Sequence, residues 1–243
     1  MLWIMAAVAP PKGAEESRAT GATSMPVPGS EASVPLVFPS SHPVVQHKIA
    51  ALRSNATRPP EFRQLVRSLA QLLAHEATAD LPTRPVEVVS PLGPAPGRVL
   101  ADIIGIVPIL RAGLGMADGV LDLIPDAEVW HIGLYRDEHT LLPTEYYKKL
   151  PARARMSIAL IVDPMLATGG SAVHACELVK AAGVPRTKLI ALLAAPEGIA
   201  RFTQAFPEVP IHVGAVDERL NTVGFIVPGL GDAGDRQFGT YPG

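Results

Sequence analysis

With 243 residues, 48% of them apolar, the chain is long enough for one α/β domain with a sizeable core, and its 21 basic residues nearly balance 23 acidic ones. That balance gives no electrostatic case for partners such as nucleic acid or a membrane, and the longest early apolar run, 1–9, is far shorter than the roughly 20 residues that span a bilayer. Because the lone Cys176 excludes a disulfide framework and a cysteine-rich zinc site, we expect a reducing, cytoplasmic location.

Residues 1–40 differ from the rest of the chain. Between Pro10 and Pro39 they are rich in Pro, Ala, Ser, Thr and Gly, and they have neither a helical nor an alternating pattern. Such a composition cannot bury enough apolar surface to offset the entropy lost on ordering. We therefore predict a disordered N-terminal extension over 1–40 and a single folded domain over 41–243.

From His42 onward the chain alternates between helical and strand-like patterns. Apolar residues at helical spacing predict a helix over 62–73. Runs of strand length follow at 103–108, 129–132, 157–162, 188–194 and 211–215. One helix is expected after the first of these runs, by way of 111–116 and through about Ile124, and others over 172–182 and 198–206. Because the strands are apolar on both faces and alternate with helices, they predict a parallel sheet covered on two sides.

The segment from 157 to 171 combines a strand, an acid and a glycine-rich loop. The apolar strand ends at Asp163, and a short loop leads to Gly169 and Gly170 at the start of a helix. At the carboxyl edge of a parallel sheet such a loop lies where ligands bind, and its N–H groups and the helix dipole suit a phosphate. The alternative is a tight turn in which Ser171 caps the helix and Asp163 is merely solvated. No Lys follows the second glycine, so this is not a Walker A loop.

Two further segments could carry chemistry. Arg111 follows a strand of the buried type and precedes two glycines, where its forked guanidinium could bind a diphosphate or form an ion pair within the fold. Residues 229–234 match the dinucleotide fingerprint G-x-G-x-x-G, but too little chain remains after Gly234 for the acid that this site needs. Such a segment can instead offer backbone groups to a small flat ligand, or it can simply cap the sheet.

Four segments together resemble the uracil phosphoribosyltransferase family of the type I phosphoribosyltransferases. The first, 162–171 (Val-Asp-Pro-Met-Leu-Ala-Thr-Gly-Gly-Ser), is similar to the phosphoribosyl-diphosphate signature, and its Asp-Pro start is typical of the uracil branch. The others are 107–116, 135–138 and 224–236, and the likeness covers about 42–240 in the family's order. The chain departs from the family at His75, where Tyr is usual, and near His139 and Leu142, where acids are usual.

The resemblance implies a fold and a set of site residues. The fold is α/β, a type I phosphoribosyltransferase-like parallel sheet flanked by helices, with a C-terminal hood or tail and a β-arm excursion. The implied catalytic residues are Asp163, Arg111 and Asp232. Phosphoribosyl diphosphate is expected on Arg111, Arg136, Asp163, Pro164, Met165, Leu166, Ala167, Thr168, Gly169, Gly170, Ser171 and Asp232, and uracil on Ile226, Gly231, Asp232 and Ala233.

The implied reaction is transfer of the phosphoribosyl group of 5-phospho-α-D-ribose 1-diphosphate to N1 of uracil, giving UMP and diphosphate in pyrimidine salvage. Mg²⁺ is expected to be bound mainly through the diphosphate, with no direct protein ligand, and GTP is a possible allosteric activator. Asp232 would either orient metal-bound water or assist proton loss from uracil, and the stretch 134–150 is a candidate cover against water. The resemblance also implies a homodimer or homotetramer.

Two other functions compete with this one. A regulator could keep the fold and bind RNA without turnover, but an RNA-binding face should be basic and aromatic, whereas the charge is balanced and only 5% of residues are aromatic. A transferase for another base is the second, and both Asp163-Pro164 and the 224–236 tail argue against it.

Overall fold

The computed structural model describes residues 36–136, 143–148 and 154–240. Within these residues a nine-stranded sheet has the order β1-β11-β10-β8-β4-β6-β7, with β5 beside β4 and β9 beside β10. Every pairing in the sheet is parallel except that of β6 with β7. Its strands are β1 (Val37–Pro39), β4 (Ile104–Leu110), β5 (Glu128–Val129), β6 (Ile132–Arg136), β7 (Pro143–Lys148), β8 (Ile158–Val162), β9 (Met165–Leu166), β10 (Arg186–Ala194) and β11 (Ile211–Val216).

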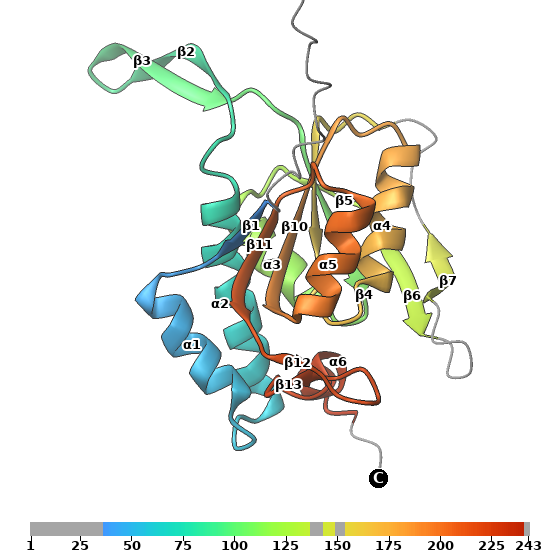
Figure 1. Cartoon of the computed structure of the whole chain (residues 1–243). Helices are drawn as coiled ribbons and strands as arrows, with labels where there is room; N and C mark the ends of the chain where they lie inside the picture. Colours follow the sequence, from blue (N-terminus) through green and yellow to red (C-terminus); the bar gives the residue numbers. More distant parts are fainter. Residues whose placement is uncertain (1–35, 137–142, 149–153, 241–243) are drawn as a thin grey trace, which may run out of the picture. The chain divides into compact units, whose positions relative to one another are not determined.

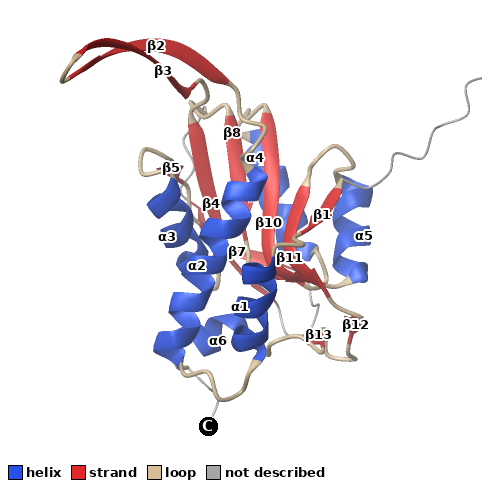
Figure 2. Cartoon of the chain, turned by 90° about the vertical axis from the view of Figure 1, so that its left-hand side faces the viewer, coloured by secondary structure: helices blue, strands red, loops and turns tan. Residues whose placement is uncertain are grey.

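Helices cover both faces of this sheet (Figures 1 and 2). One face carries α1 (Pro43–Arg53), α2 (Pro59–Ala77) and α3 (Leu114–Leu123), and the other carries α4 (Gly170–Ala181) and α5 (Pro196–Ala205). The α/β fold with a mostly parallel, doubly covered sheet is therefore the one that the alternating pattern predicted.

The two faces of the sheet are filled by alternate residues of the same strands. In β8, Ile158, Leu160 and Val162 pack toward α1–α3, whereas Ala159 and Ile161 pack toward α4 and α5. Successive side chains of a strand point to opposite faces, so a strand buried on both sides must be apolar throughout. All five of these side chains are fully buried. This is why the central strands could be recognised as continuous apolar runs.

Two smaller parts lie outside the sheet. The hairpin of β2 (Thr83–Ser90) and β3 (Gly93–Leu100) extends beyond the end of the sheet and is the expected β-arm (Figure 1). The C-terminal tail forms a hood from the antiparallel pair β12 (Arg219–Leu220) and β13 (Ile226–Val227), followed by the short helix α6 (Ala233–Phe238).

The boundary of the predicted extension needs one correction. Val37–Pro39, which were placed in the disordered stretch, form β1 and pair in parallel with β11 along the edge of the sheet. The Ser40 N–H group continues this ladder by donating to the Val213 carbonyl 2.8 Å away. The three-residue strand is ordered by its pairing with β11. The composition of residues 1–40 gives no information about such a distant partner. Residues 1–35 of the predicted extension lie outside the described residues.

Several expected elements are longer or divided in the structure. The helix predicted over 62–73 spans Pro59–Ala77, and α1 was not predicted. The strand predicted over 129–132 is divided between β5 and β6. The candidate cover over 134–150 contributes the end of β6 and strand β7, and its residues 137–142, 149 and 150 lie outside the described residues. Among the described residues, no helix is both long and apolar enough to cross a membrane.

The contact between α2 and α3 provides a test of the packing. An added Cβ on Gly119 would stand 2.2 Å from the Arg67 carbonyl oxygen and 3.0 Å from Ala70 Cβ. Gly119→Ala should therefore lower the free energy of unfolding by about 1–3 kcal/mol, although Ala is the better helix former. Urea denaturation measures this, with Gly97→Ala as control because its Cβ would meet no atom closer than Val86 Cγ1 at 3.4 Å, an ordinary contact. Equal stability of the two variants would contradict the packing described.

Candidate active site

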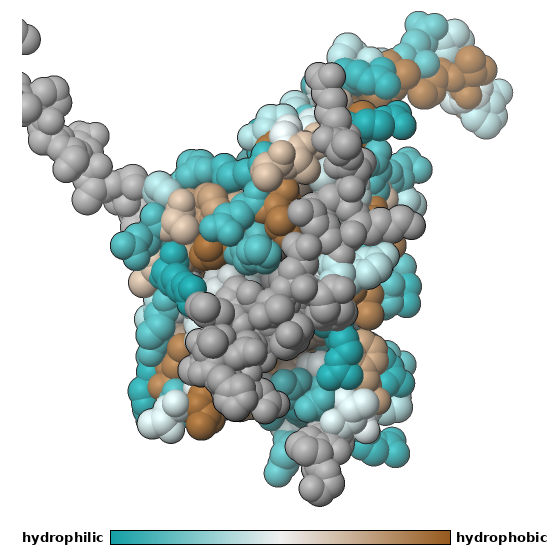
Figure 3. Space-filling view, turned by 90° about the vertical axis from the view of Figure 1, so that its right-hand side faces the viewer, coloured by the Kyte–Doolittle hydropathy of each residue, from teal (hydrophilic) through white to brown (hydrophobic). Residues whose placement is uncertain are grey.

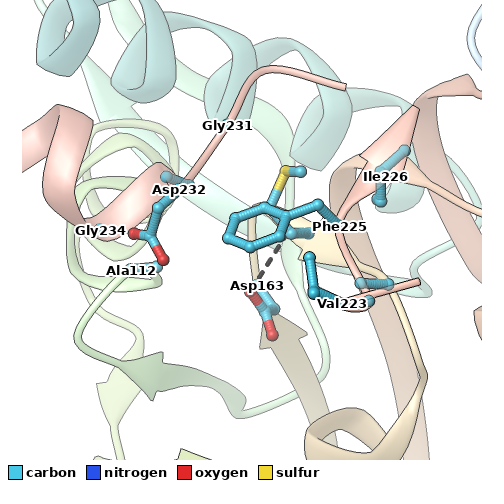
Figure 4. Close-up of a pocket in the computed structure, with 12 residues that line it drawn as sticks. Ala112, Asp163, Val223, Phe225, Ile226, Gly231, Asp232 and Gly234 are labelled. Carbon is cyan, nitrogen blue, oxygen red and sulfur yellow. Dashed lines mark hydrogen bonds between the residues drawn. The ribbon is translucent and has the colours of Figure 1, made fainter. Parts of the chain in front are cut away.

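A cavity of about 540 Å³ lies at the carboxyl edge of the sheet. It forms where the loops after β4 and β8 meet the C-terminal hood, because these strands are parallel neighbours and end together, with Pro108 opposite Val162. Figure 4 shows residues from all three segments turned toward one space. The lining residues are Ala112, Asp163, Met165, Ala167, Val223, Gly224, Phe225, Ile226, Gly231, Asp232, Ala233 and Gly234.

The loop after β8 is fastened to the neighbouring strand by its carbonyl groups. The Pro164 carbonyl accepts from the N–H groups of Leu192 and Leu193 at 3.1 and 3.0 Å. The Leu166 carbonyl accepts from Ala195 N–H at 3.0 Å. The side chains of Pro164 and Leu166 are buried, and neither lines the cavity. These two predicted site residues therefore hold the loop in place, whereas Met165 and Ala167 reach the cavity wall.

The start of α4 leaves a run of backbone N–H groups unused. Within the described part of the chain, the N–H groups of residues 168–172 have no hydrogen-bond partner, and no side chain caps the helix. The N-cap is Gly169 rather than Ser171, which lies inside the helix, so the alternative in which Ser171 caps a tight turn is wrong. Unpaired N–H groups at the positive end of a helix dipole form a binding site for an anion such as a phosphate.

Two glycines allow this loop to exist. Gly169 has φ +77°, a left-handed conformation that other residues rarely adopt. Gly198, on α5, approaches the loop so closely that an added Cβ would stand 2.4 Å from the Ala167 carbonyl oxygen. A Cβ on Gly169 would in turn meet the Gly198 carbonyl oxygen at 2.8 Å. Gly198 was not predicted as a site residue, since nothing in its local sequence indicates a contact with a loop about thirty residues earlier.

Asp163 is a partly buried acid in the cavity wall. Burial raises the pKa of its carboxyl, a hydrogen bond from Met165 N–H lowers it and the nearby charge of Asp232 raises it, and together they bring the pKa to about 7. That N–H donates to Asp163 Oδ1 over 3.2 Å. A carboxyl with this pKa is half protonated near neutral pH, so Asp163 is not the simply solvated acid of the alternative interpretation. Titratable groups with such shifts are concentrated in functional sites.

Arg111 and Arg136 lie at the ends of neighbouring parallel strands. Arg111 follows β4 directly, and Arg136 is the last residue of β6, three positions beyond the Gly133 that pairs with Leu110. The Arg111 side chain is 56% exposed and its Nη2 lies 3.3 Å from Asp235 Oδ1. The ion pair that the sequence left as an alternative is therefore present, but it is exposed and long, and the guanidinium keeps donors for a ligand.

The hood contributes the predicted base-binding residues to the cavity. Ile226, Gly231, Asp232 and Ala233 all line it, although they come from a strand, a loop and a helix. Asp232 is the N-cap of α6 and accepts a hydrogen bond from Asp235 N–H at 2.8 Å. The structure brings together every predicted site residue with a described side chain, either in the cavity wall or in the loops beside it. The side chain of Arg136 lies outside the described residues.

Sequence analysis missed the contacts that fasten the hood. Buried Asp217 accepts two hydrogen bonds from Arg53 and one from Gly229 N–H at 2.8 Å. Arg53 also donates to the Gly229 carbonyl at 2.8 Å. Gly229 has φ +61°, so the turn it makes needs both a glycine and this support. Arg53 and Asp217 lie 164 residues apart, and their pairing has no sequence signal.

A second arginine fixes the loop after β13. Buried Arg236 donates to the carbonyl groups of Leu52 at 2.7 Å, Leu230 at 2.9 Å and Ser54, and its guanidinium lies 4.5 Å from the centre of the Phe62 ring. These three carbonyl groups satisfy the charged group within the protein. The sequence motif contained Arg236, but its role is to hold the hood against the end of α1.

Two apolar residues of the hood were also not predicted. Val223 and Phe225 line the cavity and are 65% and 44% exposed. In Figure 4 the Phe225 ring lies between Asp163 and Asp232, over the middle of the cavity. An aromatic face beside backbone donors suits a flat ring.

The carboxylates of the cavity bear on metal binding. Among the described residues, no group of three or more His, Cys, Asp or Glu side chains could hold a metal ion. Asp163 and Asp232 nevertheless face the same cavity and repel each other enough to raise the pKa of Asp163. Two carboxylates in such a position can orient the water molecules of a cation that is bound through a substrate.

The chain is similar to known proteins over most of its length. The solved structure of the AQ2163 protein from Aquifex aeolicus superposes with a TM-score of 0.80 at 39% identity, covering 84% of this chain and 98% of that one. The parallel sheet, the glycine start of α4 and the hooded cavity define a type I phosphoribosyltransferase. The uracil phosphoribosyltransferase family model matches residues 39–240, and the chain belongs to that family.

Relatives named uracil phosphoribosyltransferase cover the same region. The protein of Roseiflexus castenholzii is 55% identical over 204 residues, which are 84% of this chain and 98% of that protein. The protein of Dictyoglomus thermophilum is 53% identical over 206 residues, 84% of this chain and all of that protein.

Replacing Gly198 tests the support of the loop after β8. In Gly198→Ala the new Cβ would overlap the carbonyl oxygens of Ala167 and Leu166, at 2.4 and 2.6 Å, and would displace the unpaired N–H groups that follow. We expect the KM for phosphoribosyl diphosphate to rise about tenfold or more, with the KM for uracil changed less than about twofold. Steady-state kinetics measures both, and Ala200→Ser, at an exposed position of the same helix, is the control. Unchanged kinetics would show that the loop tolerates the displacement.

The raised pKa of Asp163 predicts a pH-dependent stability. Below pH 3.8 the carboxyl is protonated whether the chain is folded or unfolded, and as pH rises toward 7 the folded state keeps a proton that the unfolded state has lost. Stability therefore falls over this window. Asp163→Asn should remove that loss and be more stable than the unmodified protein at pH 8, by on the order of 2–4 kcal/mol, and equally stable at pH 4.

Urea denaturation at several pH values measures this difference. Asp122→Asn is a control of opposite sign, because the Arg67 guanidinium lowers the pKa of Asp122 and its contribution is lost as pH falls. Parallel stability curves for Asp163→Asn and the unmodified protein would show that the pKa of Asp163 is not raised.

Proposed function

We propose that the protein transfers the phosphoribosyl group of 5-phospho-α-D-ribose 1-diphosphate to N1 of uracil, giving UMP and diphosphate in pyrimidine salvage. The observation that carries the proposal is the run of N–H groups at 168–172 that are unpaired among the described residues. They follow directly on Ala167, which lines the same cavity as Asp163 and the hood. Membership of the uracil phosphoribosyltransferase family supplies the reaction. The geometry of the cavity supports an assignment for each part of the two substrates.

The donor fits the loop after β8. We assign its 5′-phosphate to the N–H groups and hydroxyls of 167–171, because the helix start and its unpaired donors attract an anion. We assign the ribose hydroxyls to Asp163, whose carboxyl lies between this loop and the hood. Arg111, and Arg136 at the end of the next strand, are assigned to the diphosphate, which their forked donors fit.

The base fits the hood. Uracil has one N–H donor between two carbonyl acceptors, and the backbone of Ile226, Gly231 and Ala233 can offer complementary groups along one edge. Cytosine reverses part of this pattern and would leave buried polar groups unpaired, a mismatch that can discriminate by about 10⁴-fold. Phe225 would cover the face of the ring.

The transfer breaks the bond between the anomeric carbon and the diphosphate oxygen and forms a bond from that carbon to uracil N1. The diphosphate leaves with the bonding electron pair, and the proton of N1 is lost. Most of the catalysis is positioning of two substrates and stabilisation of negative charge on the leaving group, which Arg111 and Arg136 would provide. Asp232 faces the base and either takes part in this proton loss or orients water on the metal.

Phosphoribosyltransferases generally use Mg²⁺ with this donor, and the ion neutralises diphosphate charge when bound. Asp163 and Asp232 would orient its water ligands, since both carboxylates face the cavity and the charge of one raises the pKa of the other. The proposal therefore gives the protein no direct metal ligand.

The β-arm supports an assembly of two or more copies. Its side chains Val89 and Leu92 are 87% and 100% exposed, and Figure 3 shows apolar residues along the projecting arm. A groove of about 490 Å³ at its base is lined by Val99, Leu100 and Leu123 among others. Exposed apolar surface of this kind is typical of a protein interface. We propose a homodimer, or a homotetramer built from it, and sedimentation equilibrium tests the state.

Regulation and location stay as expectations. GTP as an activator follows from the family resemblance alone, and adding GTP to the assay tests it. The cytoplasm is the expected location because the lone cysteine suits a reducing compartment.

Base selectivity tests the proposed reaction. We incubate the protein with phosphoribosyl diphosphate, Mg²⁺ and each nucleobase in turn and follow diphosphate release. Uracil should be preferred over cytosine by about 10⁴-fold in kcat/KM. Asp163→Asn should keep its uracil Kd within about twofold and lose at least about 100-fold in kcat, because it acts on the ribose rather than the base.

Two results would overturn the proposal. Uracil binding without diphosphate release would identify a regulator that keeps the fold without turnover. Equal or faster release with another base would identify a transferase of different specificity.

A further inference from the structure

Gln237 is a fully buried polar residue between two parts of the site. It lies on α6 with 0% of its surface exposed. Its side-chain Nε2 donates to the Ala112 carbonyl at 2.8 Å and to the Ala233 carbonyl at 3.1 Å. Ala112 belongs to the loop after β4 and Ala233 to the hood, and both line the cavity. One amide group thus joins two segments that are far apart in the sequence.

Only half of this amide group is used. Within the described residues, Gln237 Oε1 is buried without a hydrogen-bond partner, and it faces Gly115, where an added Cβ would stand 2.3 Å away. Exchanging the amide atoms would not satisfy the group, because the oxygen would then face the carbonyl oxygens of Ala112 and Ala233. A buried acceptor without a partner costs stability that an apolar side chain of equal volume would avoid. We therefore expect the two N–H donors of Gln237 to serve a function that outweighs this cost.

The two bonded carbonyl groups lie next to groups assigned to different substrates. Ala112 directly follows Arg111, which is assigned to the diphosphate, and Ala233 is assigned to the base. The other contacts between these segments are weak, since the Arg111–Asp235 pair is exposed and 3.3 Å long and the Arg111 guanidinium lies 6.0 Å from the Phe238 ring centre. The Gln237 bridge is the buried connection, and Arg63 fixes its backbone by donating to the Gln237 carbonyl at 2.6 Å.

We propose that Gln237 is a positioning residue that couples the diphosphate-binding loop to the base-binding hood, so that occupancy of either part strengthens binding at the other. The inference rests on the proposed function for its two ligands. When diphosphate orders the loop that contains Arg111 and Ala112, the two hydrogen bonds of Gln237 hold Ala233 in the conformation that binds the base. The coupling must be reciprocal, because it is one free energy shared by two binding events.

Equilibrium binding of two ligands that cannot react with each other tests the coupling. Uracil and Mg²⁺–diphosphate contain no sugar, so both can be present without turnover. Equilibrium dialysis with labelled uracil, with and without saturating diphosphate, gives the change in uracil Kd. We expect diphosphate to tighten uracil binding at least about fivefold in the unmodified protein, and uracil to tighten diphosphate binding by the same factor.

Variants of similar volume separate the donors from the packing. Gln237→Leu and Gln237→Met remove both hydrogen bonds and fill the same space, and both should reduce the coupling to less than about twofold while the uracil Kd measured alone changes less than about threefold. Val45→Ala, at a buried position of α1, is the control because it lowers stability without touching the bridge. It should keep the full coupling.

Each result is decisive. Unchanged coupling in both Gln237 variants would overturn the inference, as would an unmodified protein that binds uracil equally well with and without diphosphate, a measurement that needs no variant to fold. Failure of the unmodified protein to bind uracil at all would instead contradict the proposed function.

Discussion

The site depends on five consecutive backbone N–H groups that have no partner in the described part of the chain. Residues 168–172 begin α4 at the carboxyl edge of the sheet, and their donors cannot be satisfied by the helix that they start. The parallel arrangement of β8 and β10 fixes where the helix starts, because the carbonyl groups of the preceding loop are bonded to β10 and to the start of α5. The loop is thus rigid on its carbonyl side and open on its N–H side. An anion completes the hydrogen bonding that the chain lacks.

The hood, which forms the other side of the cavity, is held in place by other kinds of contact than the loop after β8. The hood contains only two short strands and a helix of six residues, which bury too little apolar surface to hold themselves in place. Two arginines do this instead: Arg53 with Asp217, and Arg236 with the carbonyl groups at the end of α1. Charge-assisted hydrogen bonds to backbone groups are directional, so they fix a loop more accurately than apolar contacts of the same size. These contacts hold the part of the hood that lines the cavity.

The sequence pattern predicted those helices and strands whose apolar residues recur at a regular spacing. The central strands and α2–α5 were predicted within a few residues, because burial on both faces of a sheet imposes continuous apolar runs and a packed helix imposes a 3.6-residue period. The cavity-lining residues were found mainly through the family resemblance, since the spacing of 163–171 alone also allowed a capped turn.

What could not be predicted depends on distant contacts. Gly198 has an ordinary sequence context and is needed only because α5 approaches the loop after β8. The raised pKa of Asp163 follows from burial and from Asp232, which lies in the hood. Strand β1 is three residues long and is ordered by the edge of β11, and α6 is too short to show a period. The sequence near each of these residues gives no information about the distant residues that they contact.

The distribution of charge around the cavity favours one orientation of a bound donor. The start of α4 carries the N–H groups of 168–172, unpaired among the described residues, which favour negative charge, whereas Asp163 and Asp232 line a cavity that disfavours a further negative charge. A donor with phosphate at one end and hydroxyl groups in its middle matches this order in only one orientation, because the reverse would place its phosphate against two acids. Arg111 stands to the side, at the end of β4, where a second anionic group would leave. On the proposed function, this distribution of charge would orient the donor before any contact with the base is made.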